Sequence, residues 1–319
     1  MSEARTSGPP AATATGGSGA EPAKDAGSTK DAGTEDTGNR PGPAGGRTRR
    51  RTPRALSLLT SGVGRLWLLA LLIAAWELGT RTAGSDFYPP PSQILKALHE
   101  MWFSGPAAHL FLTDGALEDF RPSLTNLFSG WIIAAVGGIV LGLLIGRSRV
   151  AGAMLDPVLN FGRSVPPPTL IPFLLAVLDL GTQLQITTIA FGVIWPVLLN
   201  TIEGVRGVDR LQLETAKVFG ISGTLRLRRV ILPAAAPKIF AGLRVSLGFA
   251  LILMVISELV GGGTGIGARL TLAQQSFQMP EMWAGIVLLG VLGCLFNLVF
   301  HLVERRVLAW HGGARRNDA

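Results

Sequence analysis

Long runs of apolar residues alternate with short polar segments over most of the chain. A run of about 20 such residues forms a helix long enough to cross the roughly 30 Å hydrocarbon core of a bilayer. The pattern predicts about six membrane-spanning helices, of which the first and third are short or interrupted. The expected fold is therefore that of an all-α, polytopic membrane protein. The predicted spans are residues 63–80, 124–146, 169–180, 184–201, 239–260 and 283–303.

The two ends of the chain depart from this pattern. Residues 1–53 consist mainly of Gly, Ala, Thr, Pro and Ser and hold almost no large apolar residue. Such a segment cannot bury enough surface to offset the entropy of ordering, so we expect a disordered tail. Residues 54–310 are expected to form the membrane domain, and residues 311–319 a second short tail.

Basic residues gather on one side of the predicted spans. The chain carries 29 Lys and Arg against 21 Asp and Glu, a net charge of +8. Cytoplasmic loops of membrane proteins carry such an excess. We therefore expect a multi-pass membrane protein with both termini and the loop after the fourth span in the cytoplasm. Partnership with nucleic acid is not expected, because the sequence has no zinc-finger spacing, basic heptad helix or aromatic-basic platform.

A short helix is expected within the polar segment 81–123. Three prolines lead into Ser92, which is predicted to cap this helix. The apolar residues that follow share one face, and this pattern predicts a helix that lies in the membrane interface. These residues are Ile94, Leu95, Leu98, Met101 and Trp102.

The longest polar interruption in the second half of the chain is residues 208–233. Its sequence predicts a helix, a sharp turn and a second helix. Asp209 and Ser222 are placed to cap the two helices, and Gly220 to take the left-handed conformation after the first. The second helix is expected to stop near Pro233.

The corner between these two helices is the tripeptide Phe219-Gly220-Ile221, an apolar tip on a basic stem. The segment is either a solvated loop between spans or a docking element for another protein. Loops between spans need neither helix caps nor an apolar corner, so the pattern favours docking.

The same segment resembles the EAA loop of ABC-importer permeases. Thr215 departs from the usual motif and Val230 replaces its isoleucine, while the other motif residues match in spacing. The resemblance implies a type I ABC-importer permease fold and a cytoplasmic loop that fits a groove on an ATP-hydrolysing subunit. The coupling residues it implies are Glu214, Ala216, Gly220, Leu232 and Pro233, and the apolar corner adds Phe219 and Ile221 to the predicted coupling residues.

The resemblance extends over residues 60–310. The stretches RSVPPPTLIPFLL, FGVIWPVLLNTIEGVRGVD and LVERRVLAW are similar to the nitrate/sulfonate/taurine-type branch of these permeases. This implies a permease homodimer in a bacterial-type plasma membrane, with ATP-binding cassette ATPase subunits and an extracytoplasmic solute-binding protein. The implied solute is a small anion such as an aliphatic sulfonate, taurine or nitrate. The branch also includes importers of bicarbonate, riboflavin and pyrimidine precursors.

Motifs that carry chemistry are scarce. The sequence shows no P-loop, no metal-binding cluster and no G-x-S-x-G nucleophile motif. The glycine-rich run 261–267 lacks the Lys-Ser or Lys-Thr of a phosphate loop, so it is expected to form a tightly packed turn. We expect no catalytic residue, cofactor or metal, and ATP hydrolysis by a separate subunit. The sequence does not show which residues line a solute pathway, and it assigns no role to Glu77 or Glu258.

Two other classes of function remain open. A self-contained channel or secondary carrier would need no ATPase, although a proton-coupled carrier usually has several charged residues deep in its spans. A membrane-anchored scaffold would dock a cytosolic protein without moving a solute. Dependence of uptake on an ATPase separates the importer from a carrier, and uptake itself separates it from a scaffold.

Overall fold

The computed structural model describes residues 54–106, 111–261 and 263–309, with side chains from Trp67 onward. The predicted tails, 1–53 and 311–319, lie outside these residues. The arrangement below is that of the compact unit that begins at Leu58.

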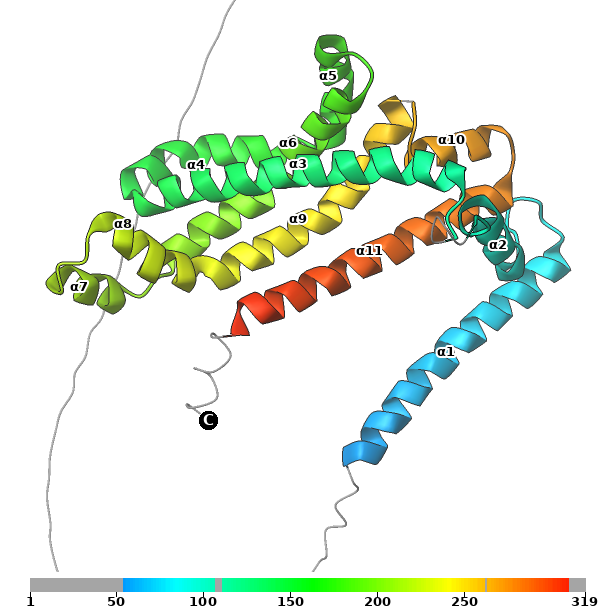
Figure 1. Cartoon of the computed structure of the whole chain (residues 1–319), viewed down its shortest axis with the longest axis horizontal. Coiled ribbons are helices and arrows are strands. Elements are labelled where there is room, and N and C mark those ends of the chain that lie inside the picture. The colour runs from blue at the N-terminus through cyan, green and yellow to red at the C-terminus, as the bar shows by residue number, and fades with distance from the viewer. Residues whose placement is uncertain (1–53, 107–110, 262, 310–319) are drawn as a thin grey trace, which may run out of the picture. The chain divides into compact units, whose positions relative to one another are not determined.

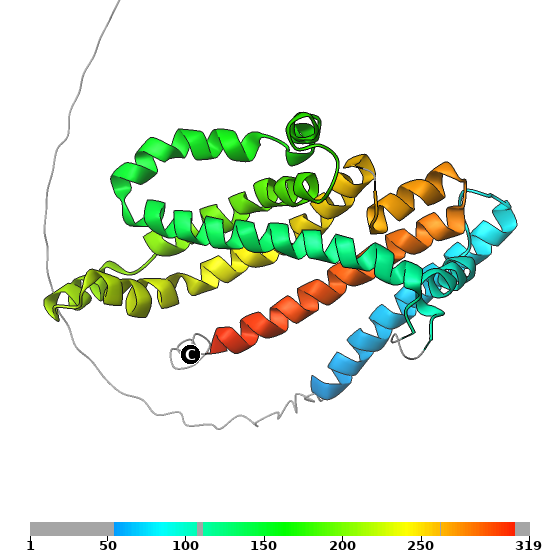
Figure 2. The same cartoon turned by 45° about the horizontal axis from the view of Figure 1, so that its top comes forward.

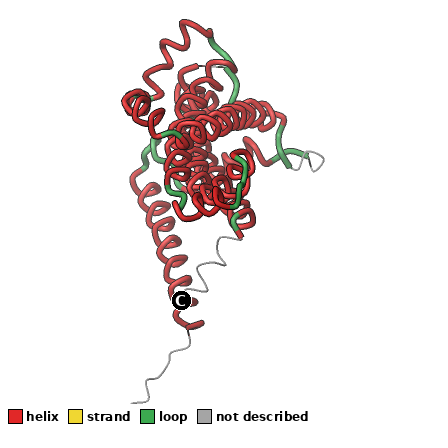
Figure 3. Tube along the Cα trace, turned by 90° about the vertical axis from the view of Figure 1, so that its left-hand side faces the viewer, coloured by secondary structure: helices red, strands yellow, loops and turns green. Residues whose placement is uncertain are grey.

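All regular secondary structure of the described residues is helical, as predicted (Figure 3). Short π-helical turns occur at His99–Phe103 and Leu227–Ile231, and a 3-10 turn at Pro167–Leu170. The α-helices, labelled in Figure 1, are α1 (Arg54–Ala83), α2 (Pro91–Leu98), α3 (Asp114–Arg147), α4 (Arg149–Ser164), α5 (Ile171–Leu178), α6 (Thr182–Arg206), α7 (Arg210–Val218), α8 (Gly223–Arg226), α9 (Leu232–Gly261), α10 (Ile266–Gln275) and α11 (Met279–Val307).

Four helices of the described region are long and apolar enough to cross a membrane. They are α3, α6, a helix running from Gly223 to Gly261, and α11. The predicted second, fourth, fifth and sixth spans lie within these four helices and are confirmed. The predicted first span lies within the 30-residue helix α1. We call the end of the bundle that carries α7 and α8 the loop end, and the opposite end the far end (Figure 1).

Helices α3 and α6 pack closely along parallel axes. Glycines of α3 lie against β-branched residues of α6 in matching order along both helices, because small residues let two backbones approach closely. A Cβ added at Gly142 would lie only 2.6 Å from Cβ of Thr201. Since both helices run from the far end to the loop end, the chain between them has to return across the membrane. The contact pairs are Gly130–Ile189, Gly138–Val197, Gly142–Thr201 and Gly146–Val205.

The return crossing corrects the predicted third span at 169–180. The eight residues of α5 extend only about 12 Å, too short to cross a core of roughly 30 Å. The 16-residue helix α4, which lies between the predicted second and third spans, precedes it and carries much of the crossing. The two parts bend by 83° at the proline-rich break and together qualify as one broken span or a re-entrant loop.

Helix α9 runs antiparallel to α6 and completes the main core. Gly242 lies against Asn200 near the loop end, whereas Gly192 lies against Leu253 nearer the far end. Helix α11 packs on α9, and its Phe300 belongs to the same buried cluster. The other buried members are Leu127, Ala134, Ile189, Val193, Leu247, Ala250, Leu253 and Met254.

The predicted interfacial helix is wrong in its environment and in its cap. Trp102 is fully buried in a cluster that includes residues of α2, α3, α10 and α11, because a complementary apolar surface is present there. The N-cap position of α2 is Pro90. The backbone N–H and the hydroxyl of Ser92 instead donate to the Glu77 carboxylate, at 3.0 and 2.7 Å. Glu77 therefore ties the end of α1 to the start of α2.

Candidate functional site

The first helix of the coupling loop, residues 208–233, ends in a left-handed turn as predicted. Gly220 has a φ of 66°, and its N–H donates to the carbonyl oxygen of Lys217 at 2.9 Å. The N–H of Ile221 donates to the carbonyl oxygen of Ala216 at 3.0 Å. These two bonds form a Schellman motif, which satisfies the last carbonyls of α7 and reverses the chain.

The requirement for glycine at this corner is purely conformational. A Cβ added at Gly220 would meet no atom within 4 Å. A side chain would therefore fit in space, but the positive φ would strain any L-residue. At the start of α7, the Asp209 carboxylate accepts the N–H of Leu211 at 3.0 Å, which confirms the predicted cap.

The second half of the loop differs from the prediction. Ser222 occupies the N-cap position of α8, but its side chain makes no capping hydrogen bond. The helix does not stop near Pro233, since one helical path of 39 residues runs from Gly223 to Gly261. Pro233 is the second residue after the π-helical turn Leu227–Ile231, and such a local widening accommodates a proline without ending the helix. The loop is therefore continuous with a span.

The tip of the loop exposes large apolar side chains. Val218 is 86% exposed, Phe219 is 78% exposed and Leu211 is 68% exposed, while Ile221 is half-buried. Sequence reasoning identified Phe219 and Ile221 but missed Leu211 and Val218. Their spacing of seven residues, two turns of one helix face, is the signal that would have found them.

The base of the loop is packed into the bundle. Ala216 is buried at the turn, and Leu213 packs against a cluster formed by α6, α9 and the intervening segment. The buried members of this cluster are Val205, Val208, Ile231, Ala235 and Ile239. The loop thus combines an exposed apolar tip with an anchored base.

The predicted coupling residues occupy three different positions in this loop. Glu214 and Phe219 are exposed at or near the tip, together with Gly220. Ala216 is buried beneath the turn. Leu232 and Pro233 lie at the start of α9, where the loop joins the span, so they do not share the surface of the tip.

Glu258 anchors the glycine-rich turn at the far end. Its carboxylate is fully buried, and Oε2 accepts the N–H of Gly267 at 2.7 Å. The Ser123 hydroxyl oxygen accepts the N–H of Ile266 at 2.9 Å. Two residues from α9 and α3 therefore satisfy two of the free N-terminal N–H groups of α10. A Cβ added at Gly265 would lie 2.6 Å from the Glu258 carboxyl carbon, so the turn is tightly packed there as predicted, whereas a Cβ added at Gly263 would meet no atom within 4 Å.

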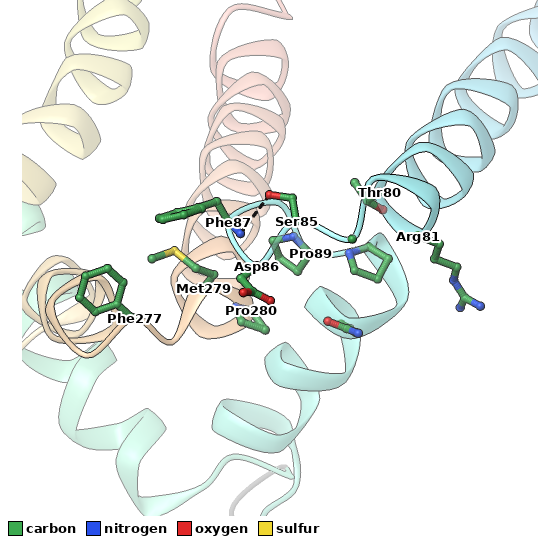
Figure 4. Close-up of a pocket in the computed structure, with 12 residues that line it drawn as sticks. Thr80, Arg81, Ser85, Asp86, Phe87, Pro89, Phe277, Met279 and Pro280 are labelled. Carbon is green, nitrogen blue, oxygen red and sulfur yellow. Dashed lines mark hydrogen bonds between the residues drawn. The ribbon is translucent and has the colours of Figure 1, made fainter.

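A crevice of about 780 Å³ lies at the far end, beside the end of α1 and the start of α11 (Figure 4). Asp86, Phe87 and Met279 are among its lining residues, and Arg81 on its rim pairs with Glu77. In the part of the chain that the structure describes, no group of three His, Cys, Asp or Glu side chains is placed to hold a metal.

Comparison with protein families identifies the class of protein that this bundle represents. Residues 138–309 match the family described as "Binding-protein-dependent transport system inner membrane component". The match includes the coupling loop and the helices α6, α9 and α11. The chain belongs to this family and is the permease subunit of an ABC transporter, a multi-pass membrane protein.

Curated relatives agree over most of the chain. The putative aliphatic sulfonates transport permease protein SsuC of Bacillus subtilis is 33% identical over 248 residues, which are 77% of this chain and 86% of that protein. The taurine transport system permease protein TauC of Escherichia coli is 30% identical over 77% of this chain and 88% of its own length. The nitrate import permease protein NrtB of a Synechocystis species is 31% identical over 75% and 87%, respectively.

Solved structures show the same fold. Two structures of the MetNI methionine ABC transporter in inward-facing conformations match with TM-scores of 0.53 and 0.52, at 20% and 21% sequence identity. Each match covers 59% of this chain and 93% of the other. The fold is that of a type I ABC-importer permease, as the sequence resemblance implied.

Proposed function

We propose that the coupling loop docks this permease onto separate ATP-hydrolysing subunits and transmits their movement to the spans. The observation that carries the proposal is the continuity of the helix from Gly223 to Gly261. A displacement of the apolar tip acts on α9 directly, because no flexible linker lies between them. Such a displacement would bias the bundle between two conformations open to opposite sides.

The residues of the loop have different proposed roles. Phe219 and Ile221, with Leu211 and Val218, supply the apolar contact to the ATPase, and Glu214 supplies a polar contact beside them. Ala216 and Gly220 maintain the turn that presents this tip. Leu232 and Pro233 form the joint through which the movement reaches α9.

The loop end is proposed to face the cytoplasm, together with both termini. Support comes from the charges around α7 and α8, where several arginines lie at the ends of helices. Carboxylates gather at the far end, and this asymmetry agrees with the positive-inside rule. In this orientation the tip faces the compartment that holds ATP.

The complete importer is proposed to contain two copies of this permease, ATP-binding cassette subunits and an extracytoplasmic solute-binding protein. These partners follow from family membership. The proposed solute is a small anion, such as an aliphatic sulfonate, taurine or nitrate, because relatives carrying those names share about a third of their sequence with this chain.

The direct test is uptake by proteoliposomes that contain the permease with its ATPase and solute-binding protein. Uptake of a radiolabelled sulfonate should require internal ATP and both partner proteins. Equal uptake by the permease alone would instead identify a channel or secondary carrier. Formation of the complex without any uptake, for each of the candidate anions, would favour a docking scaffold.

A further inference from the structure

An arginine on α4, Arg163, lies level with the middle of α6, and no described residue provides it with a counter-charge. Arg163 is exposed, and among the residues that the structure describes it takes part in no ion pair. An ionisable side chain facing lipid at this depth is costly, and such residues usually face a water-filled cavity or a partner group. The position of Arg163 therefore calls for a polar surrounding.

The depth of Arg163 follows from the contacts of α4 with α6. Gly152 lies against Arg206 at the loop end of α6, and Gly162 lies against the indole of Trp195 near the middle of that helix. The ten positions from Gly152 to Gly162 on α4 thus span nearly the same length as the eleven positions from Arg206 to Trp195 on α6, as expected for two helices aligned lengthwise. Figures 1 and 2 both show α4 running lengthwise with α3 and α6. Arg163 adjoins Gly162 and is about 21 Å along the helix from Arg149.

Helix α4 has a polar face and a separate apolar face. Asn160 lies one turn before Arg163, and Asp156 a further turn toward the loop end, where it pairs with Arg206 at 4.0 Å. All three α4 side chains are exposed. The apolar residues lie on another side of the helix, as their spacing of three and four residues requires. They are Val150, Met154, Val158 and Phe161, and all are exposed.

Two arginines on other helices have charged partners, and the unpaired Arg121, Arg147, Arg305 and Arg306 lie outside the predicted spans, toward the ends of α3 and α11. Arg244 of α9 contacts both His301 and Glu304 of α11, and Arg269 of α10 pairs with Asp119 of α3. Beside Gly162, the buried indole N–H of Trp195 has no hydrogen-bond acceptor among the described residues. The Arg163 side chain and the unpaired indole N–H of Trp195 therefore lie at about the same level along the bundle.

We propose that the polar face of α4 lines the solute pathway, and that Arg163 is the counter-charge that holds an anionic solute at mid-membrane depth. The inference rests on the proposed importer function and names the residues that give it its preference for anions. Between Arg163 and the loop end, this face carries the negative charge of Asp156 and, with Arg206 of α6, two positive charges. The half of the pathway nearer the loop end would therefore favour anions.

Cysteine labelling of the full-length protein in membrane vesicles tests the proposal. Cys294 is the single cysteine, so its replacement by serine gives a clean background. In this background, Asn160→Cys probes the polar face and Val158→Cys, on the apolar face of the same helix, is the matched control. The probes are two water-soluble methanethiosulfonates of similar size, one with a sulfonate and one with a trimethylammonium group.

We expect Asn160→Cys to react at least about tenfold faster than Val158→Cys, with a preference for the anionic reagent. Adding Arg163→Gln should lower that preference by about tenfold or more, because a unit charge one helical turn away is removed, and Arg163→Lys should retain it. The proposal would be overturned if both positions were labelled equally or not at all. It would also be overturned if Arg163→Gln left the preference for the anionic reagent unchanged, or if Arg163→Lys lost that preference to the same extent. Labelling requires no ATPase, so this outcome is separate from failure of the importer function.

Discussion

The N–H of Ile221 donates to the carbonyl oxygen of Ala216 at 3.0 Å, across a corner whose central residue, Gly220, has a positive φ. This bond closes the turn around two residues four positions apart that the sequence resemblance marks together, Ala216 and Gly220. Ala216 lies buried beneath the turn, and Gly220 permits the reversal. Both residues shape the surface that Phe219 presents without belonging to its apolar contact area.

Gly220→Ala should weaken docking of the ATPase although the added methyl group meets no atom. The left-handed conformation costs an L-residue about 1–2 kcal/mol, so the tip would populate other conformations. Gly223→Ala is the matched control, since it also adds a methyl in open space but lies in the first turn of α8, where φ is not positive. Co-purification with the ATPase should fall only for Gly220→Ala, and an equal loss for both variants would contradict this account.

Gly142→Ala should destabilise the packing of α3 on α6. The added Cβ would lie 2.6 Å from Cβ of Thr201, and overpacking of this kind costs about 1–3 kcal/mol. Gly137→Ala on the same helix is the control, because its Cβ would be 3.6 Å from Ile194, an ordinary contact distance. Thermal unfolding in detergent should show a lower midpoint for Gly142→Ala alone. Equal midpoints for the two variants would mean that α3 and α6 accommodate the added methyl group at Gly142 without loss of stability, which would contradict this account.

Glu258→Ala should destabilise the far end of the bundle, because the N–H of Gly267 would lose its acceptor in a buried place. Leaving such a group unpaired costs about 1–3 kcal/mol. Glu258→Gln keeps an oxygen at this position and should retain most of the stability. Hydrogen exchange of the first amides of α10 is the readout, and rapid exchange is expected only in the alanine variant. Equal protection in both variants would show that the carboxylate is not the anchor of this turn.

Strong local signals made much of the fold predictable. The spans within α3, α6, α9 and α11 follow from long apolar runs, and the turn at Gly220 from the glycine after a capped polar helix. Helix α4 was missed because it is amphipathic: Asp156 and Arg163 interrupt its apolar pattern, and only the parallel packing of α3 on α6 shows that this segment has to cross.

Tertiary contacts determined what the sequence could not show. Pro233 was expected to end a helix, but the π-helical turn before it lets the helix continue. The apolar face around Trp102 was assigned to the membrane interface, whereas the bundle itself buries Trp102. At the predicted coupling loop, the apolar corner identified Phe219, whereas the seven-residue spacing of Leu211 and Val218 was overlooked and the structure shows both side chains exposed.

Copurification of the ATPase with a Phe219→Asp variant is the most direct test of the central claim. A charge in place of an exposed apolar side chain at the tip should abolish the complex and ATP-driven uptake while leaving the permease folded. Phe277→Asp is the matched control, because Phe277 is also aromatic and 74% exposed but lies at the far end. The account predicts loss of the ATPase for Phe219→Asp and retention for Phe277→Asp. A complete, active complex with Phe219→Asp would contradict it.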